Sequence, residues 1–252
     1  MFGKYRMALN SGINPPYSPA YPMEFGCTLR TLDVMTRVDK KKLQTLLADT
    51  PFEVVNDRVA FQFMASPGHT LATHTGRMYD LMVTIAVRYK DLFTQNHIYM
   101  YCSDPMGICS GRELFGYTKK DCYYQWYEAE DGVITSTVNR RGFPLAEVKF
   151  TPDPKAPVIR LADGAEQPAG EIHVRRVPDP TREGATAYSD IMYRRTPLSY
   201  AAPIAGRAEM TLHPSAFDPL TELEPEVISA QFQVSDVYGG GLKVEDRRLF
   251  KL

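Results

Sequence analysis

The chain has 252 residues, of which 44% are hydrophobic and 23% are charged, as is typical of soluble globular proteins. Its 29 basic and 30 acidic residues leave a formal net charge of −1, which gives no electrostatic reason to expect nucleic acid or membrane as a partner. No apolar run approaches the ~20 residues of a membrane span, and the first residues lack the apolar core of a signal peptide. These properties predict one soluble domain over residues 1–252.

Four cysteines are present, and none of them forms a C-x-x-C motif: Cys27, Cys102, Cys109 and Cys122. In a chain of this size such isolated cysteines are most simply reduced thiols. We therefore expect a cytoplasmic protein.

Most of the predicted elements are strands, because β-branched and aromatic residues recur in short runs. In chain order, a strand over 29–38 is followed by a helix that begins at the N-cap Asp39 and ends before Pro51. In this helix Leu43, Leu46 and Leu47 share one face, and the lysines at 40–42 are expected in solvent. Further strands are expected at 81–89, 98–102, 133–138 and 227–235.

Other segments read as irregular or helical. Residues 151–184 contain six prolines and predict a long loop, and Pro214 predicts the start of a second short helix. Gly239-Gly240-Gly241 lacks both G-x-G-x-x-G spacing and a following helix, so it predicts a turn. His69 and His74 do not have the i,i+4 spacing of metal ligands on a helix, so they predict no metal site. Pattern alone supports a β-rich single domain.

The most informative local feature is the pair of adjacent lysines Lys119 and Lys120, which lies in apolar and aromatic surroundings. Burial can lower the pKa of a lysine from ~10.4 by roughly 3–5 units. A second ammonium about 6 Å away adds repulsion on the order of two further units. One lysine could therefore act as a neutral amine near neutral pH, whereas most Lys-Lys pairs are solvated surface residues.

The residues around the lysine pair resemble a family signature. Gly111-Arg112-Glu113-Leu114, followed after two residues by Tyr117-Thr118-Lys119-Lys120, resembles the signature of acetoacetate decarboxylases. Similar segments at 17–22, 59–64, 219–223 and 226–229 extend the resemblance over about residues 17–235. It implies an α+β fold that is mostly antiparallel β, a closed cone-shaped β-barrel with flanking helices, and a large homo-oligomer. It also implies an enzyme that acts on a small-molecule keto acid without a cofactor or metal.

The resemblance assigns the imine-forming role to Lys119 and the lowering of its pKa to Lys120. The amine attacks the ketone of a β-keto acid, and the protonated imine then withdraws electrons from the bond to the carboxylate. Carbon dioxide leaves, and the resulting enamine is protonated and hydrolysed. Apolar walls favour the step in which the charge of the carboxylate is lost. Met100, Tyr117 and Phe25 are candidates for these walls, although each can equally be a core residue.

The remaining candidate residues include three departures from the family pattern. Glu113 belongs to the motif and can orient the lysines or pair with Arg112. Asp80 and Gln62 stand where the family has active-site glutamates, and Gln62 can hydrogen-bond but cannot exchange a proton as a carboxylate does. Leu29 stands at the position of the family's arginine. Arg30, the candidate replacement, is one residue away and faces the other side of a strand unless a bulge intervenes.

Three functions remain open. An imine at Lys119 serves decarboxylation of an acetoacetate-like β-keto acid, and it equally serves a lysine-dependent aldolase or dehydratase of pyruvate-type 2-oxo acids. A barrel that binds a small carbonyl compound without turning it over is the third. The lysine pair predicts the intermediate, while the altered acids at Gln62 and Asp80 leave the product undecided.

Overall fold

A computed structural model describes residues 25–71, 74–164, 166–183, 186–195, 201–236 and 246–251. In this part of the chain the secondary structure is mostly strand, with few helices. The strands are β1 (Phe25–Arg37), β2 (Glu53–Leu71), β3 (His74–Tyr89), β4 (Leu92–Cys102), β5 (Lys119–Asp121), β6 (Tyr123–Glu128), β7 (Ile134–Arg140), β8 (Phe143–Pro152), β9 (Glu171–Pro178), β10 (Thr186–Arg195), β11 (Ile204–Leu212), β12 (Glu226–Asp236) and β13 (Asp246–Lys251). The helical segments are α1 (Lys40–Leu46), α2 (Pro105–Ser110), the π-helix η2 (Gly111–Phe115) and the 3₁₀-helix η3 (Leu220–Leu223).

All of these strands belong to one mainly antiparallel sheet. Its order is β13-β10-β9-β4-β3-β2-β1-β12-β11-β8-β7-β6, and β5 pairs in parallel with β4. Between the described strands, no pairing joins the two ends β13 and β6, so the closed barrel expected from the resemblance is not confirmed. The expectation of an antiparallel β-rich fold with few helices is confirmed.

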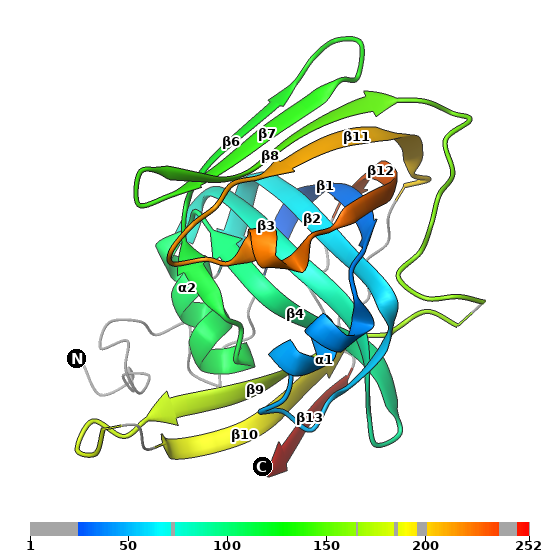
Figure 1. Cartoon of the computed structure of the whole chain (residues 1–252). Coiled ribbons are helices and arrows are strands. Elements are labelled where there is room, and N and C mark those ends of the chain that lie inside the picture. Colours follow the sequence, from blue (N-terminus) through cyan, green and yellow to red (C-terminus); the bar gives the residue numbers. More distant parts are fainter. Residues whose placement is uncertain are drawn as a thin grey trace.

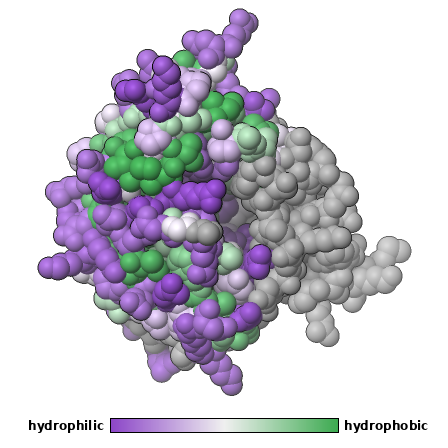
Figure 2. Space-filling view, turned by 90° about the vertical axis from the view of Figure 1, so that its right-hand side faces the viewer, coloured by the Kyte–Doolittle hydropathy of each residue, from purple (hydrophilic) through white to green (hydrophobic). Residues whose placement is uncertain are grey.

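The main hydrophobic core lies on one face of β1–β4. Leu32, Phe63, Leu81 and Tyr101 are fully buried, and they are directly registered across these strands. The same core includes Tyr124, Ile134, Val138, Leu145, Val148 and Phe150 of β6–β8. Figure 1 shows β6, β7, β8 and β11 lying across β1–β3, which is the packing that buries this face. On the surface shown in Figure 2, hydrophobic residues form separate patches between hydrophilic ones.

The opposite face of β1–β5 carries a different row of side chains. In direct register it runs Gln231, Asp33, Gln62, Met82, Met100 and Lys119. Because successive side chains of a strand point to opposite faces, this row lies on the other side of the sheet from the Leu32–Tyr101 row. The fold therefore separates an apolar core face from a face with polar residues and methionines, and Lys119 belongs to the second.

Several predicted elements are confirmed with small shifts in their ends. The predicted first strand corresponds to β1, and the predictions at 81–89, 98–102, 133–138 and 227–235 fall on β3, β4, β7 and β12. Asp39 caps α1, since its carboxylate accepts a hydrogen bond of 2.8 Å from the Lys41 amide. Leu43 and Leu47 are buried, but Leu46 is 46% exposed, so the predicted apolar face is narrower than expected.

Two predicted elements are wrong, and others lie outside the described residues. No helix follows Pro214; the chain instead forms η3 at Leu220–Leu223. The predicted loop over 151–184 contains β9, because the alternating residues of 171–178 pair with β10. The turn at 239–241 and the side chains of the histidine pair at 69 and 74 lie outside what the structure describes. None of the helices in the described ranges is long and apolar enough to cross a membrane.

A buried cluster of charges anchors the loop before η3 to the sheet. Asp218 is 1% exposed and accepts hydrogen bonds from Lys120 Nζ at 2.6 Å and Arg140 Nη1 at 2.8 Å. Tyr101 also donates to this carboxylate. The aspartate thus binds both Lys120 and Arg140 at the edge of the core.

We expect Asp218→Ala to lower the free energy of unfolding by about 3 kcal/mol, because it leaves the buried guanidinium of Arg140 with only the exposed Asp121, at 3.7 Å, as an acidic partner. Lys120 is 34% exposed and can turn to solvent, which keeps the loss at the lower end of the range for broken buried pairs. Urea denaturation measures the change. Asp91→Ala, which removes an exposed partner of Arg248, is the control and should cost less than about 1 kcal/mol. Equal losses in the two variants would contradict the assignment.

Candidate active site

The segment before Lys119 brings its side chain into a tightly packed position. Asp104 caps α2, η2 follows directly, and Gly116 with a φ of 73° turns the chain towards β5. A Cβ atom on Gly111 would lie 2.9 Å from Lys119 Cδ and 2.9 Å from Tyr117 Cδ2. The glycine that opens η2 therefore leaves the space through which the lysine stem passes.

Lys119 is buried against a carboxylate. The residue is 5% exposed. Its Nζ lies 3.2 and 3.1 Å from Oδ1 and Oδ2 of Asp80, a residue that is 2% exposed. Met100, Phe115 and Tyr117 form an apolar cluster on the same face, with Met82 and Met192 packed against it. The site thus combines one ion pair with apolar walls.

The ion pair determines the protonation state of Lys119. Burial lowers the pKa of Lys119, but the charge and hydrogen bonds of Asp80 more than offset burial and leave this pKa above its ordinary value. In this state Lys119 carries its proton. The expectation that the free protein holds Lys119 with a lowered pKa is therefore wrong.

Lys120 lies on the other face of β5. It is registered with Tyr101, in the row of core residues, and it binds Asp218. Adjacent strand residues point to opposite sides of a sheet, so the two ammonium groups are not neighbours on one face. The predicted role of Lys120 in lowering the pKa of Lys119 by direct repulsion is thus not supported by their geometry.

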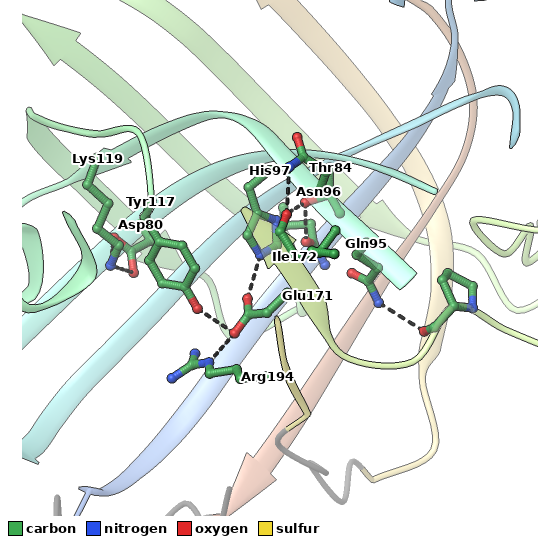
Figure 3. Close-up of polar contacts among 12 residues, drawn as sticks. Asp80, Thr84, Gln95, Asn96, His97, Tyr117, Lys119, Glu171, Ile172 and Arg194 are labelled. Atoms are coloured by element: carbon green, nitrogen blue, oxygen red, sulfur yellow. Dashed lines mark hydrogen bonds and ion pairs between the residues drawn. The ribbon is translucent and has the colours of Figure 1, made fainter. Parts of the chain in front are cut away.

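A second buried ion pair lies beside the first. Glu171 on β9 accepts hydrogen bonds from the Tyr117 hydroxyl and from Arg194 Nε on one oxygen, and lies 2.8 Å from His97 Nε2 on the other. Figure 3 shows Tyr117 between the Lys119–Asp80 pair and the Glu171–Arg194 pair. Burial raises the pKa of Glu171, but Arg194 and His97 outweigh burial and lower it well below its ordinary range. Glu171 is therefore a carboxylate.

A chain of hydrogen bonds continues from His97 across the sheet. His97 Nδ1 lies 2.8 Å from Thr84 Oγ1, and Thr84 donates to Gln62 Oε1 at 2.7 Å. Gln62 Nε2 donates to Asp33 at 2.9 Å. Burial raises the pKa of Asp33, although three glutamine side chains donate hydrogen bonds that lower it. This chain fixes the amide of Gln62 and directs its oxygen to Thr84.

A cleft of about 1210 Å³ opens where β4 and β9 separate next to η2. Its lining includes His97, Tyr117 and His173, so it reaches the residues around Glu171. Arg112, Lys120, Arg175 and Arg176 also line it, with Glu113 as an acidic member. The cleft is one route by which an anionic small molecule could approach the buried residues.

One group of side chains in the described ranges has the composition of a metal site. Ligand atoms of His97, Glu171 and His173 all lie within 4.8 Å of one another, and His173 Nε2 is buried without a hydrogen-bond partner. Burial and the neighbouring His97 lower the pKa of His173 well below its ordinary value, which keeps a lone pair on its ring. However, Glu171 already binds the Arg194 cation, which disfavours a divalent ion at the same carboxylate.

Comparison with known proteins gives the family of this chain. The chain matches the acetoacetate decarboxylase family over residues 11–249. It belongs to that family. No curated protein matches the chain.

Solved structures of family-like proteins share the fold at low sequence identity. Acetoacetate decarboxylase from Legionella pneumophila is 17% identical, with a TM-score of 0.71 and coverage of 95% of this chain and 98% of that chain. An acetoacetate decarboxylase-like enzyme from Sphingomonas wittichii RW1 is 16% identical, with a TM-score of 0.75 and coverage of 98% and 99%. The enduracididine biosynthesis enzyme MppR complexed with pyruvate is 12% identical, with a TM-score of 0.72 and coverage of 92% of each chain.

Of the residues predicted from the acetoacetate decarboxylase signature, Asp80, Met100 and Tyr117 lie close to Lys119. Met100 is its neighbour in register, and the Tyr117 ring centroid is 5.9 Å from its Nζ. The side chain of Phe25 lies outside the described part, although its backbone begins β1. These positions agree with the predicted apolar walls, whose role in substrate binding remains a prediction.

Three other predicted residues do not contact Lys119. Gln62 is in the same row, but Met82 and Met100 stand between the two. Glu113 lies on η2 and lines the cleft; its Oε2 is buried without a partner, and burial raises the pKa of this carboxyl group. Arg30 forms a two-pronged ion pair of 2.6 Å with Glu128 on β6, on the face opposite Asp33. The prediction that Arg30 replaces the family arginine is not supported by this position.

The sequence analysis missed His97, Glu171 and Arg194. They come from β4 and from the consecutive strands β9 and β10, which strand pairing brings together. Glu171 and His173 are two residues apart and thus share a face of β9. This spacing indicates a shared face only if the segment is known to be a strand.

The ion pair makes a prediction about the pH dependence of imine formation. Asp80→Asn removes the carboxylate that raises the pKa of Lys119, leaving burial, which lowers it. We expect the midpoint of the pH profile to fall by at least about one pH unit. The measurement is the rate of cyanoborohydride-trapped imine formation with acetone between pH 6 and pH 11.

Lys120→Ala is the matched comparison for that experiment. Because Lys120 lies on the other face, its removal should leave the midpoint within about 0.3 pH units of wild type. A clear upward shift in Lys120→Ala would show that repulsion between the lysines sets the pKa of Lys119 and would contradict the geometry.

Proposed function

We propose that this protein is a Schiff-base lyase that decarboxylates an acetoacetate-like β-keto acid to a ketone and carbon dioxide. The observation that carries the proposal is the buried Lys119, held by Asp80 among methionine and aromatic side chains. A lysine in such a setting is costly to bury, and ionisable groups buried in this way are enriched at functional sites.

Asp80 supplies the proton transfers of this mechanism. One proton moves from Lys119 to Asp80 across their 3.1 Å contact, which frees the amine to attack the substrate ketone. The hydroxyl of the carbinolamine takes one proton from solvent and leaves as water, which gives a protonated imine while Asp80 keeps its proton. The bond between the α-carbon and the carboxylate then breaks, and its electrons flow to the imine nitrogen while carbon dioxide leaves.

The second half of the reaction returns the enzyme to its starting state. Protonated Asp80 then gives its proton to the carbon of the enamine, and water hydrolyses the resulting imine. The product ketone departs and Lys119 recovers its proton. The apolar walls of Met100, Phe115 and Tyr117 favour the step in which the carboxylate charge disappears.

A second candidate is a lysine-dependent aldolase or dehydratase of pyruvate-type 2-oxo acids. The observation that favours it is the buried cation of Arg194, whose charge acts on Lys119 across the Tyr117 ring. A fixed cation stabilises a carboxylate that is kept throughout the reaction more than one that is lost. The same imine at Lys119 serves both reactions.

The test is reductive trapping with acetoacetate and, separately, with pyruvate, followed by peptide mass mapping and a carbon dioxide assay. We expect one reduced adduct on Lys119, carbon dioxide release from acetoacetate, and neither result with Lys119→Ala. Lys149→Ala, which removes an exposed lysine of β8, should behave as wild type.

Different outcomes separate the candidates. Trapping of pyruvate without carbon dioxide from acetoacetate would favour the aldolase or dehydratase. Trapping followed by release of every ligand unchanged would favour a protein that only binds carbonyl compounds. An unlabelled protein with every oxo acid would contradict imine chemistry at Lys119.

A further inference from the structure

Arg194 is a buried arginine whose hydrogen-bonding capacity is only partly used. Its side chain is 17% exposed, and its ion pair with Glu171 is made through Nε. The guanidinium carbon lies 4.1 Å from the centroid of the Phe115 ring and 5.5 Å from that of Tyr117. Neither terminal nitrogen, Nη1 or Nη2, donates to a carboxylate of the described residues, and Figure 3 shows both turned away from Glu171, to the side on which Lys119 lies.

Other arginines near the sheet differ in this respect. Arg30 places both Nε and Nη2 on Glu128, and Arg175 places both Nε and Nη2 on Asp190. Their two-pronged faces are therefore occupied by protein carboxylates. Arg194 is held at Nε, and its two terminal nitrogens remain as a pair of parallel donors, the geometry that matches a carboxylate.

The ion pairs around Lys119 do not compensate the charge of a substrate carboxylate, which this guanidinium can bind. The Lys119–Asp80 and Glu171–Arg194 pairs are each neutral, so a bound keto acid adds one uncompensated negative charge. A carboxylate buried among methionine and aromatic side chains requires a cation or several hydrogen-bond donors. Lys119 cannot supply them permanently, because its nitrogen becomes the imine.

Both groups lie against the ring of Tyr117. Lys119 Nζ and the guanidinium of Arg194 lie 5.9 and 5.5 Å from the same Tyr117 ring centroid. Met192, two residues before Arg194 on the same face of β10, packs against the cluster that contains Met100. Apolar side chains thus pack beside both groups.

We infer that the terminal nitrogens of Arg194 bind the carboxylate of a short 2-oxo or 3-oxo acid whose carbonyl carbon is held by Lys119. This inference rests on the proposed imine at Lys119 and assigns the specificity for acids over neutral ketones to Arg194. Glu171 positions the guanidinium by accepting a hydrogen bond from Nε, and Tyr117 donates to the same carboxylate oxygen.

The test compares acids with neutral ketones in the full-length protein. Wild type and Arg194→Gln are reacted with acetoacetate and pyruvate, and with 2,4-pentanedione and acetone, under reductive trapping. We expect Arg194→Gln to lose about ten- to a hundredfold in the rate of labelling by each acid, as for the loss of charged hydrogen bonds. Labelling by the neutral ketones should change less than about threefold.

Two further variants guard against a purely structural effect. Arg194→Gln combined with Glu171→Gln removes the unpaired carboxylate and should keep the same selective loss with the acids. Arg207→Gln, an exposed arginine of β11 paired with Asp153, is the control and should label as wild type.

Equal losses with acids and neutral ketones, in the single and the double variant, would overturn the assignment, as would unchanged labelling by both. Failure of wild type to label with either class would instead remove the imine at Lys119 itself. The two failures are therefore distinguishable.

Discussion

Side-chain alternation along β5 determines which groups can act on the reactive lysine. Five strands bring Asp33, Gln62, Met82, Met100 and Lys119 into one registered row, and the adjacent row of Leu32, Phe63, Leu81, Tyr101 and Lys120 faces the core. A shift of register by one residue would exchange these faces. The sheet therefore gives Lys119 to the site and Lys120 to a structural contact with Asp218.

This separation changes how a nucleophilic amine can arise. Repulsion between two ammonium groups needs them on one face, whereas Lys119 faces the Asp80 carboxylate at 3.1 Å. Burial lowers the pKa of Lys119 and Asp80 raises it, and the carboxylate prevails. Activation then depends on moving one proton over a short contact, for which Asp80 is both the acceptor and the later donor.

The two buried ion pairs also define what the site can accept. Each is neutral by itself, and they flank the Tyr117 ring. An acid that enters brings a charge that neither pair neutralises, so selectivity between acids and neutral carbonyl compounds depends on donors that remain available. The partly occupied guanidinium of Arg194 has that property, in contrast to Arg30 and Arg175.

Local signals in the sequence were sufficient for much of the fold. Alternation predicted β12, the cap at Asp39 predicted α1, and the glycine-led signature predicted Lys119 and its neighbour Tyr117. Alternation alone puts Arg30 on the opposite face from the site, whereas the resemblance made it the candidate for the family arginine, and its ion pair with Glu128 does not support that role.

The remaining parts depend on contacts between distant segments. His97, Glu171 and Arg194 meet through the pairing of β4, β9 and β10, and β9 lies in a proline-rich stretch that reads as a loop. Lys120 is next to Lys119 in the sequence but lies on the other face of β5, which the dipeptide by itself does not reveal.

The most direct test of the account is the ionisation of Lys119 in the free protein. In protein labelled with ¹³C at lysine Cε, the Lys119 resonance, assigned by its absence in Lys119→Met, can be followed by NMR from pH 6 to pH 11. The account predicts that this resonance keeps its protonated position through pH 10, because Asp80 holds the pKa of Lys119 above its ordinary value. A titration completed below pH 8 would contradict it.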